Sequence, residues 1–239
     1  AVVNVVESSI ARDADLVLPI HCGQEIGVAS TKAFMGQMLV LYILTTKISI
    51  DQNCITKKEY QTKIKRLLQL SNSAKKTLKV DQKILNIGKV FAEAKGSMFL
   101  GRGYSFPIAL EGALKLKELA YVHAEGYPAG EMKHGPLALI EEGMPVVVLA
   151  PRDEHYKKTI SNMQEVIARG AKVLLITNKN KDEVISENIW ERIEVDQLDE
   201  ELMPFLMTIP LQKLAFYSAL EKGYDIDKPR NLAKSVTVE

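Results

Sequence analysis

Pro145-Val146-Val147-Val148-Leu149-Ala150 is an apolar run that contains no polar residue. A strand with one solvent-facing side alternates apolar and polar residues, whereas a strand buried on both faces is apolar throughout. We therefore predict that this run is a central strand of a parallel sheet with helices on both faces.

Strand and helix patterns alternate on both sides of this run. Strands that alternate with helices of this length indicate βαβ units, so the predicted fold class is α/β, with parallel-sheet subdomains flanked by helices. The predicted strands are Val2–Val6, Leu16–Ile20, Ser97–Leu100, Pro145–Ala150, Lys172–Thr177 and Trp190–Val195. The predicted helices are Ser30–Ile48, Thr56–Thr77, Pro107–Val122, Tyr156–Arg169 and Glu200–Lys222.

Local signals also suggest where subdomains and helices end. The polar stretch Leu70–Val80 is the best candidate for a domain boundary, so we predict a first subdomain over 1–78, a second over 79–224 and a tail over 225–239. Gly170 and Gly223 each follow a helix pattern, as a glycine at a helix C-terminus does. The tail has no long apolar period, but its proline and its interleaved apolar residues favour a docked segment over a disordered one.

Composition excludes several classes of protein. The 239 residues include 31 basic and 30 acidic side chains, a net charge of +1. Nucleic-acid-binding proteins usually carry a basic stripe, so DNA and RNA are not expected partners. Cys22 and Cys54 have neither CxxC nor metal-type spacing. This excludes a disulfide scaffold and favours a reducing, cytoplasmic compartment.

We expect no membrane partner and no signal peptide. No apolar run approaches the roughly 20 residues of a membrane span. The longest run, Met38–Leu44, is followed by Thr45, Thr46 and Lys47. The N-terminus lacks a basic region followed by an apolar one. It opens on Ala1–Val6, which has the pattern of a strand already under way, so we expect a fragment of a longer protein.

A glycine turn follows the strand predicted at Ser97–Leu100. Gly101-Arg102-Gly103 leads directly into a predicted helix. Ligands of open α/β sheets bind beyond the carboxyl ends of strands, where helix N-termini favour anions. A lone Gly-x-Gly is a weak signal, however, and a tight turn that needs a positive φ is the favoured interpretation.

The helix after this turn carries a charged stripe. Glu111, Lys115, Glu118 and Val122 recur at intervals of four, three and four residues and so share one face. One interpretation is a solvated face with surface salt bridges, and composition favours it. The other is a buried pocket wall in which a carboxylate and an ammonium face a substrate.

The stretch Ala124–Pro136 is rich in glycine, proline and titratable groups and reads as a loop. His134, between Lys133 and Gly135, suits an exposed or ligand-facing position better than a core position. A plain surface histidine remains the alternative. No two histidines have the spacing of metal ligands, so we expect no metal site.

Four motifs, in order and with family spacing, resemble the glucosamine-6-phosphate synthase family. The resemblance runs from about Ser8 to Glu239. The motifs are Glu25–Phe34, Ala109–Glu118, Glu131–Pro136 and Pro229–Glu239.

The resemblance implies two SIS (sugar isomerase) subdomains and an enzyme that converts fructose 6-phosphate and glutamine-derived ammonia to glucosamine 6-phosphate. It implies that Lys234 forms an imine with the keto sugar and that Glu118 moves a proton between C2 and C1. It also implies that His134, supplied across the interface of a homodimer, assists ring opening. The other residues implied to contact the sugar are Lys115, Val28, Ser30 and Ala233. The chemistry requires no cofactor, because a lysine supplies the electron sink and a carboxylate shuttles the proton.

The family also carries an N-terminal glutaminase domain and a Ser/Thr-Gly-rich loop that binds the sugar phosphate. We find neither in this sequence. We therefore expect the 239-residue fragment to be inactive by itself.

Two other functions stay open at this point. A fructosamine-phosphate deglycase would share the glutamate and histidine chemistry but act on a preformed sugar amine. A non-catalytic SIS module that senses a sugar phosphate would need neither Glu118 nor Lys234. The terminal segment with Lys234 favours the synthase.

Overall fold

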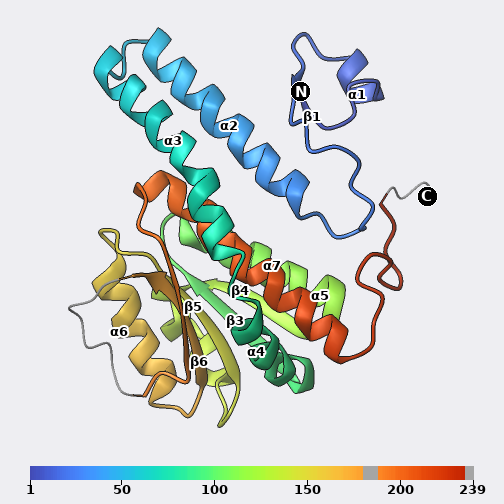
Figure 1. Ribbon diagram of the computed structural model, residues 1–239. Coiled ribbons are helices and arrows are strands. Elements are labelled where there is room, and N and C mark those ends of the chain that lie inside the picture. The colour runs from blue at the N-terminus through green and yellow to red at the C-terminus, as the bar shows by residue number, and fades with distance from the viewer. Residues whose placement is uncertain (180–187, 235–239) are drawn as a thin grey trace. The chain divides into compact units, whose positions relative to one another are not determined.

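The computed structural model describes residues 1–179 and 188–234. The chain divides into two compact units (Figure 1). One unit comprises residues 1–69 and 230–239, and the other comprises residues 70–229. The division falls within helix α3 (Lys57–Thr77), so the polar stretch that suggested a boundary is helical up to Thr77. The subdomain limits predicted from the sequence stay a prediction.

The larger unit is built on a five-stranded sheet in which every pairing is parallel. The strands are β3 (Gly96–Gly101), β4 (His123–Pro128), β5 (Pro145–Ala150), β6 (Lys172–Asn178) and β7 (Glu191–Val195). Their spatial order is β4-β3-β5-β6-β7, which places β5 at the centre. The α/β fold class with a parallel sheet is confirmed.

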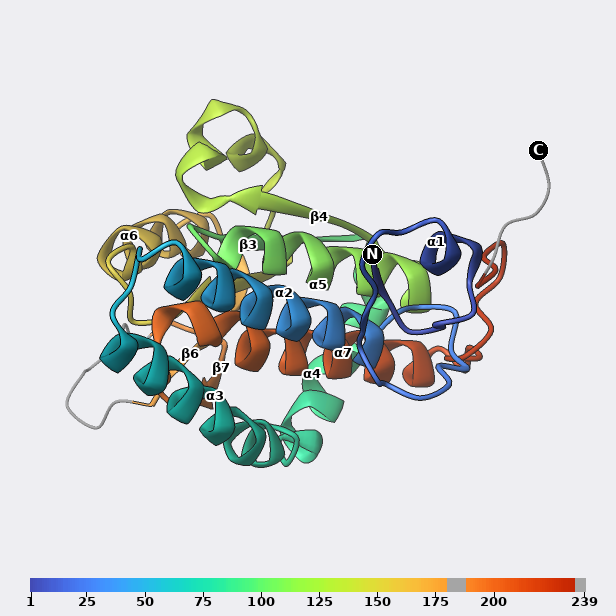
Figure 2. The ribbon, with the colours of Figure 1, turned by 90° about the horizontal axis from the view of Figure 1, so that it is seen from above.

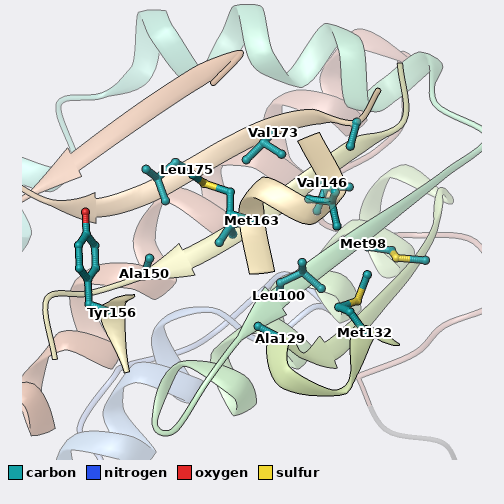
Figure 3. Packing of buried hydrophobic residues seen from close by; sticks show 13 residues of the cluster. Met98, Leu100, Ala129, Met132, Val146, Ala150, Tyr156, Met163, Val173 and Leu175 are labelled. Atoms are coloured by element: carbon teal, nitrogen blue, oxygen red, sulfur yellow. The ribbon is translucent and has the colours of Figure 1, made fainter. Parts of the chain in front are cut away.

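Strand β5 is buried along its whole length, as its apolar run predicts. Val146, Val148 and Ala150 point to one face, because side chains alternate along a strand. There they pack with residues of α6 (Tyr156–Ile167), such as Met163, and with Met132 of the 3-10 helix η1 (Ala129–His134) (Figure 3). A single apolar cluster thus joins the sheet, α6 and η1.

The other face of the sheet is covered by α4 (Asp81–Glu93), α5 (Ser105–Ala120) and α7 (Met203–Glu221). Helices α5 and α7 run side by side (Figure 2). At Gly112 of α5, an added Cβ would lie 3.0 Å from a ring carbon of Phe99 and 2.7 Å from a methyl carbon of Leu211. The absence of a side chain at Gly112 therefore lets α5 fit closely between β3 and α7.

Two elements of this unit were missing from the sequence prediction. Helix α4 buries an apolar face that includes Ile84, Ile87 and Phe91. Strand β4 occupies part of the stretch predicted as a loop, so that interpretation is wrong for residues 124–128. Gly126 disfavours a strand by propensity, yet a Cβ there would lie 2.9 Å from the backbone of Leu110, so the contact with α5 requires glycine.

Helix boundaries in the larger unit largely follow the signals in the sequence. Gly170 and Gly223 have φ values of +86° and +69°, the left-handed conformation expected at helix C-termini. The helix predicted over Glu200–Lys222 begins later, at Met203, after the 3-10 helix η3 (Glu200–Leu202), and Pro204 lies in its first turn, where a missing N–H is tolerated. A second short 3-10 helix, η2 (Pro136–Leu139), follows η1.

The smaller unit contains β1 (Val2–Val3), α1 (Ser9–Arg12), β2 (Leu18–Pro19) and α2 (Lys32–Asp51), with the first part of α3. Strands β1 and β2 pair in parallel and are shorter than predicted. Ser8 caps α1 by accepting a hydrogen bond from the N–H of Ala11. Few apolar side chains of this unit are buried, among them Ala11, Ile20 and Ala29.

Helix α2 corrects the expectation that no segment approaches the length of a membrane span. Its 20 residues include a window with a mean hydropathy of 1.5, and 6% of that window is buried. The sequence interpretation treated Thr45, Thr46 and Lys47 as an interruption, but the average over the helix remains apolar. By length and composition α2 could cross a membrane. One such helix is weak evidence, because core helices and signal sequences also have these properties.

Gly101 provides a stability test of the packing at the carboxyl end of β3. A Cβ on Gly101 would lie 2.2 Å from the carbonyl oxygen of Ser105, which belongs to the backbone of α5 and cannot rotate away. We expect Gly101→Ala to lower the free energy of unfolding by about 1–3 kcal/mol, measured by urea denaturation. Gly96→Ala in the same strand is the control, because its Cβ would meet only one atom, at 3.6 Å. Equal stability of the two variants would contradict the proposed crowding.

Candidate active site

Helix α5 positions the charged stripe and is fixed at both ends. At its start, Gly103 turns the chain with a φ of +54°, which supports the interpretation of Gly101–Gly103 as a tight turn. At its end, Tyr121 adopts a left-handed conformation with a φ of 53°. The ring of Tyr121 lies 4.7 Å from the ring of Tyr224, so an aromatic contact accompanies this unfavourable backbone geometry.

The charged stripe of α5 is a buried cluster. The side chain of Lys115 is 3% exposed and that of Glu111 is 9% exposed, while Glu118 is 22% exposed. The Nζ of Lys115 lies 2.5 Å from Oε2 of Glu118 and 3.5 Å from Oε1 of Glu111. The interpretation of this stripe as a solvated face is therefore wrong. One ammonium is held between two carboxylates, one helical turn away on either side.

The two carboxylates of the cluster differ in their surroundings. Glu111 is the more buried, and burial raises its pKa. The charge of Lys115 opposes this rise, and the charge of Glu118 adds to it. Glu118 is the carboxylate of this cluster that reaches the surface, next to a fixed ammonium. A carboxylate in that position can take up and return a proton if a substrate approaches it.

His134 lies apart from this cluster in the contacts recorded for the described residues. It ends η1, whose Met132 and Ala129 are buried in the core. The imidazole itself is 75% exposed, and its Nε2 lies 3.8 Å from Oε2 of Glu131. Gly135 follows with a φ of 138°, which favours glycine. The expectation of an exposed histidine is confirmed, and its chemical role stays a prediction.

The C-terminal tail returns to the segment before α2 in the smaller unit. The Nζ of Lys234 donates hydrogen bonds to Oε2 of Glu25, at 2.6 Å, and to the carbonyl oxygen of Gly27, at 2.9 Å. The prediction of a docked tail is confirmed up to Lys234, and residues 235–239 of the terminal motif lie outside the described residues. Lys234 thus joins the segment that carries Val28 and Ser30.

The three residues implied to line the sugar site differ in exposure. Val28 and Ser30 are partly exposed, on either side of the buried Ala29. Ala233 is exposed and directly precedes Lys234. Lys115, Glu118 and His134 belong to the other unit, so the two groups of residues are described separately.

Glu25 is a residue that the site prediction missed. Its Oε1 accepts hydrogen bonds from the backbone N–H groups of Thr31 and Ala33, at 3.0 and 3.2 Å. It thereby satisfies donors at the start of α2, where Thr31 provides no side-chain cap. Burial raises the pKa of Glu25, but the hydrogen bonds from Lys234 and these N–H groups, with the charge of Lys234, lower it from 4.5 to about 2. The carboxylate therefore stays ionised at neutral pH. Its place as the first residue of the motif Glu25–Phe34 was the available signal.

Across residues 1–179 and 188–234, no group of three or more His, Cys, Asp or Glu side chains is arranged to hold a metal ion. The candidate residues of the two units are lysines, carboxylates and one histidine. A lysine amine can form an imine, a carboxylate or a histidine can transfer a proton, and an ammonium can stabilise negative charge.

Comparison with known proteins gives a consistent result. Residues 90–222 match the model of the SIS domain. The whole chain is 48% identical to an isomerizing glutamine–fructose-6-phosphate aminotransferase from Mesorhizobium japonicum, of which it covers 39%. The chain thus spans about two fifths of the length of that curated relative.

Solved structures show the same similarity. The C-terminal domain of glucosamine-fructose-6-phosphate aminotransferase from Francisella tularensis is 43% identical, with a TM-score of 0.91 over 94% of this chain and 63% of that chain. A glucosamine-6-phosphate deaminase from Thermotoga maritima is 25% identical, with a TM-score of 0.75 over 98% of this chain and 65% of that chain. The SIS match spans the parallel sheet from β3 to β7 and all of α5, which carries Lys115 and Glu118. This chain belongs to the SIS domain family.

Proposed function

We propose that this chain is the sugar-isomerase part of an enzyme that makes glucosamine 6-phosphate from fructose 6-phosphate and glutamine. The similarity to named aminotransferases over the whole chain supports this proposal. The residues of the two candidate groups support it chemically, since they include an amine, a carboxylate beside an ammonium, and a histidine.

The single observation that carries the proposal is the placement of Lys234. A primary amine in a chain terminus is usually solvated, but this one is bound by a buried carboxylate and a carbonyl group. This arrangement keeps Lys234 next to the segment that carries Val28 and Ser30. An isomerase that works through a lysine imine needs such an amine, whereas a sugar-phosphate sensor does not.

In the proposed reaction the candidate residues act one after another. His134 assists ring opening, which exposes the keto group of the sugar. The amine of Lys234 leaves Glu25, loses its proton and attacks the keto carbon to form an imine with release of water. Ammonia then replaces Lys234 at C2, which frees the lysine amine and leaves the C2 imine of the sugar. Glu118 takes a proton from C1 while this imine accepts the electron pair, and it returns a proton to C2, so that C1 becomes the aldehyde and C2 carries the amine. Lys115 holds Glu118 in place and lies near the hydroxyl groups of the sugar.

The proposed partners follow from the same assignment. The ammonia comes from glutamine in an N-terminal glutaminase domain of a longer chain, which fits the greater length of the curated relative. The active form is a homodimer, in which His134 serves the site of the partner subunit. We place the enzyme in the cytoplasm, where the thiols of Cys22 and Cys54 stay free.

Lys234→Arg tests the imine directly. Arginine keeps the positive charge that pairs with Glu25, but it does not deprotonate to attack a carbonyl. In the complete protein that carries this chain, the variant should lose glucosamine 6-phosphate synthesis and keep glutamine hydrolysis. Borohydride should trap a sugar on the parent and not on the variant. Continued synthesis would refute the imine, and continued cleavage of a fructosamine phosphate would favour a deglycase.

Glu118→Gln tests the proton transfer. The variant should still bind fructose 6-phosphate, because the amide keeps the shape of the carboxylate. Its rate of solvent deuterium incorporation into the sugar should fall by about two to four orders of magnitude, as expected for loss of a general base. Exchange at the parental rate would show that Glu118 serves only as an ion-pair partner of Lys115.

Mixed dimers test the assignment of His134 to the partner's site. His134→Ala and Lys234→Arg subunits should each be inactive as homodimers. In a heterodimer, one of the two sites would combine an intact histidine with an intact lysine, so up to half of the sites should regain activity. The measurement is synthesis by tagged heterodimers purified from coexpressed subunits. A heterodimer as inactive as both parents would argue that each site is built from one chain.

A further inference from the structure

Glu111 has no role in the proposed reaction, yet it is the most buried carboxylate of the cluster on α5. Its side chain is 9% exposed, and its Oε1 is a buried atom that accepts no hydrogen bond of good geometry. The nearest recorded cation is the Nζ of Lys115, 3.5 Å away. A buried carboxylate with so few partners is costly, so its presence requires a physical explanation.

Stability does not supply that explanation. A buried ion pair seldom stabilises a fold more than apolar side chains of the same size would. The contact between Glu111 and Lys115 is also longer than the 2.5 Å contact between Lys115 and Glu118. Burial further raises the pKa of Glu111, which means that burial disfavours the ionised carboxylate. Lys115 already has a close carboxylate partner, and one more is not needed to neutralise it.

The second carboxylate becomes important when Glu118 takes up a proton. Glu118 then loses its negative charge, while the ammonium of Lys115, 3% exposed, stays buried. Without Glu111 this ammonium would have no counter-charge among the recorded contacts on α5. With Glu111 one turn before it, Lys115 keeps a carboxylate partner in both protonation states of Glu118.

We propose that Glu111 is a positioning residue for proton transfer by Glu118, because it holds the buried ammonium of Lys115 from the preceding turn of α5 whether or not Glu118 carries a proton. This inference rests on the proposed function. Glu111 acts through Lys115 and does not touch the sugar. Its carboxylate allows Glu118 to cycle between its two forms without displacement of Lys115.

Two substitutions distinguish the effect of the charge of Glu111 from the effect of its shape. Glu111→Gln keeps the shape and removes the charge, so Lys115 then attracts only Glu118 and makes proton uptake by Glu118 more costly. In the complete protein, we expect the kcat for deuterium exchange into fructose 6-phosphate to fall about tenfold, while KM stays within about twofold. Glu111→Asp keeps the charge and shortens the side chain, so it should retain more of the kcat than Glu111→Gln.

A packing role gives the opposite order, because Gln fills the space of Glu and Asp does not. A kcat of Glu111→Gln equal to the parental value, or lower activity for Asp than for Gln, would overturn the inference. The melting temperature of Glu111→Gln should not fall, since the variant buries one charge fewer. A fall in melting temperature and a rise in KM that parallel the loss of kcat would also overturn it.

Two matched variants complete the experiment. Glu93→Gln changes the same charge at an exposed position of α4 and should leave kcat unchanged. Glu118→Gln, measured in parallel, tests the proposed function itself. If Glu118→Gln still exchanges deuterium at the parental rate, the proposed function fails. If Glu118→Gln is inactive and Glu111→Gln has the parental kcat, only the inference about Glu111 fails.

Discussion

The close approach of α5 to the sheet is the constraint on which the larger unit depends. Gly112 on the helix admits Phe99 and Leu211, and Gly126 on β4 admits the backbone of Leu110. No side chain of any size fits at these two positions without displacement of a neighbour. The stripe of the same helix that carries Lys115 is buried as well. Burial on this helix brings the ammonium of Lys115 and the two carboxylates into an environment where their charges interact strongly.

The two candidate lysines, one in each unit, are held by different means. Lys115 is buried on a rigid helix and is surrounded by carboxylates of that same helix, so its position varies little. Lys234 is 45% exposed and lies on an irregular tail, where Glu25 and Gly27 bind it. A fixed lysine suits electrostatic support of a proton-transferring group. The proposed imine requires a lysine that can leave its carboxylate partner, and a position on an irregular tail allows this.

Glu25 connects the tail to the start of α2. One carboxylate oxygen accepts from backbone N–H groups of the first turn, and the other accepts from Lys234. Both carboxylate oxygens therefore accept hydrogen bonds. The resulting low pKa of Glu25 keeps the carboxylate ionised at neutral pH, so that it continues to bind Lys234.

The sequence by itself determined the fold class, the central strand and most of the helices. An unbroken apolar run such as Val146–Leu149 has one stable environment, a sheet covered on both faces, and local periodicity is enough to detect it. The motifs also indicated Lys115, Glu118, His134 and Lys234 as candidates. These signals are local, because each is contained in a few consecutive turns or residues.

Only the tertiary structure decided the features that depend on distant contacts. Strand β4 contains a glycine that disfavours strands by propensity, and pairing with β3 and contact with α5 outweigh that preference. The spacing of the charged residues on α5 is equally compatible with a solvated face and with a buried face. The structure shows that this face is buried. The link between Glu25 and Lys234 joins residues 209 positions apart, which no local pattern encodes. Hydrogen bonds and burial depend on distances in space. The sequence was therefore enough to identify the candidate reactive residues, whereas their interaction partners became known only from the folded structure.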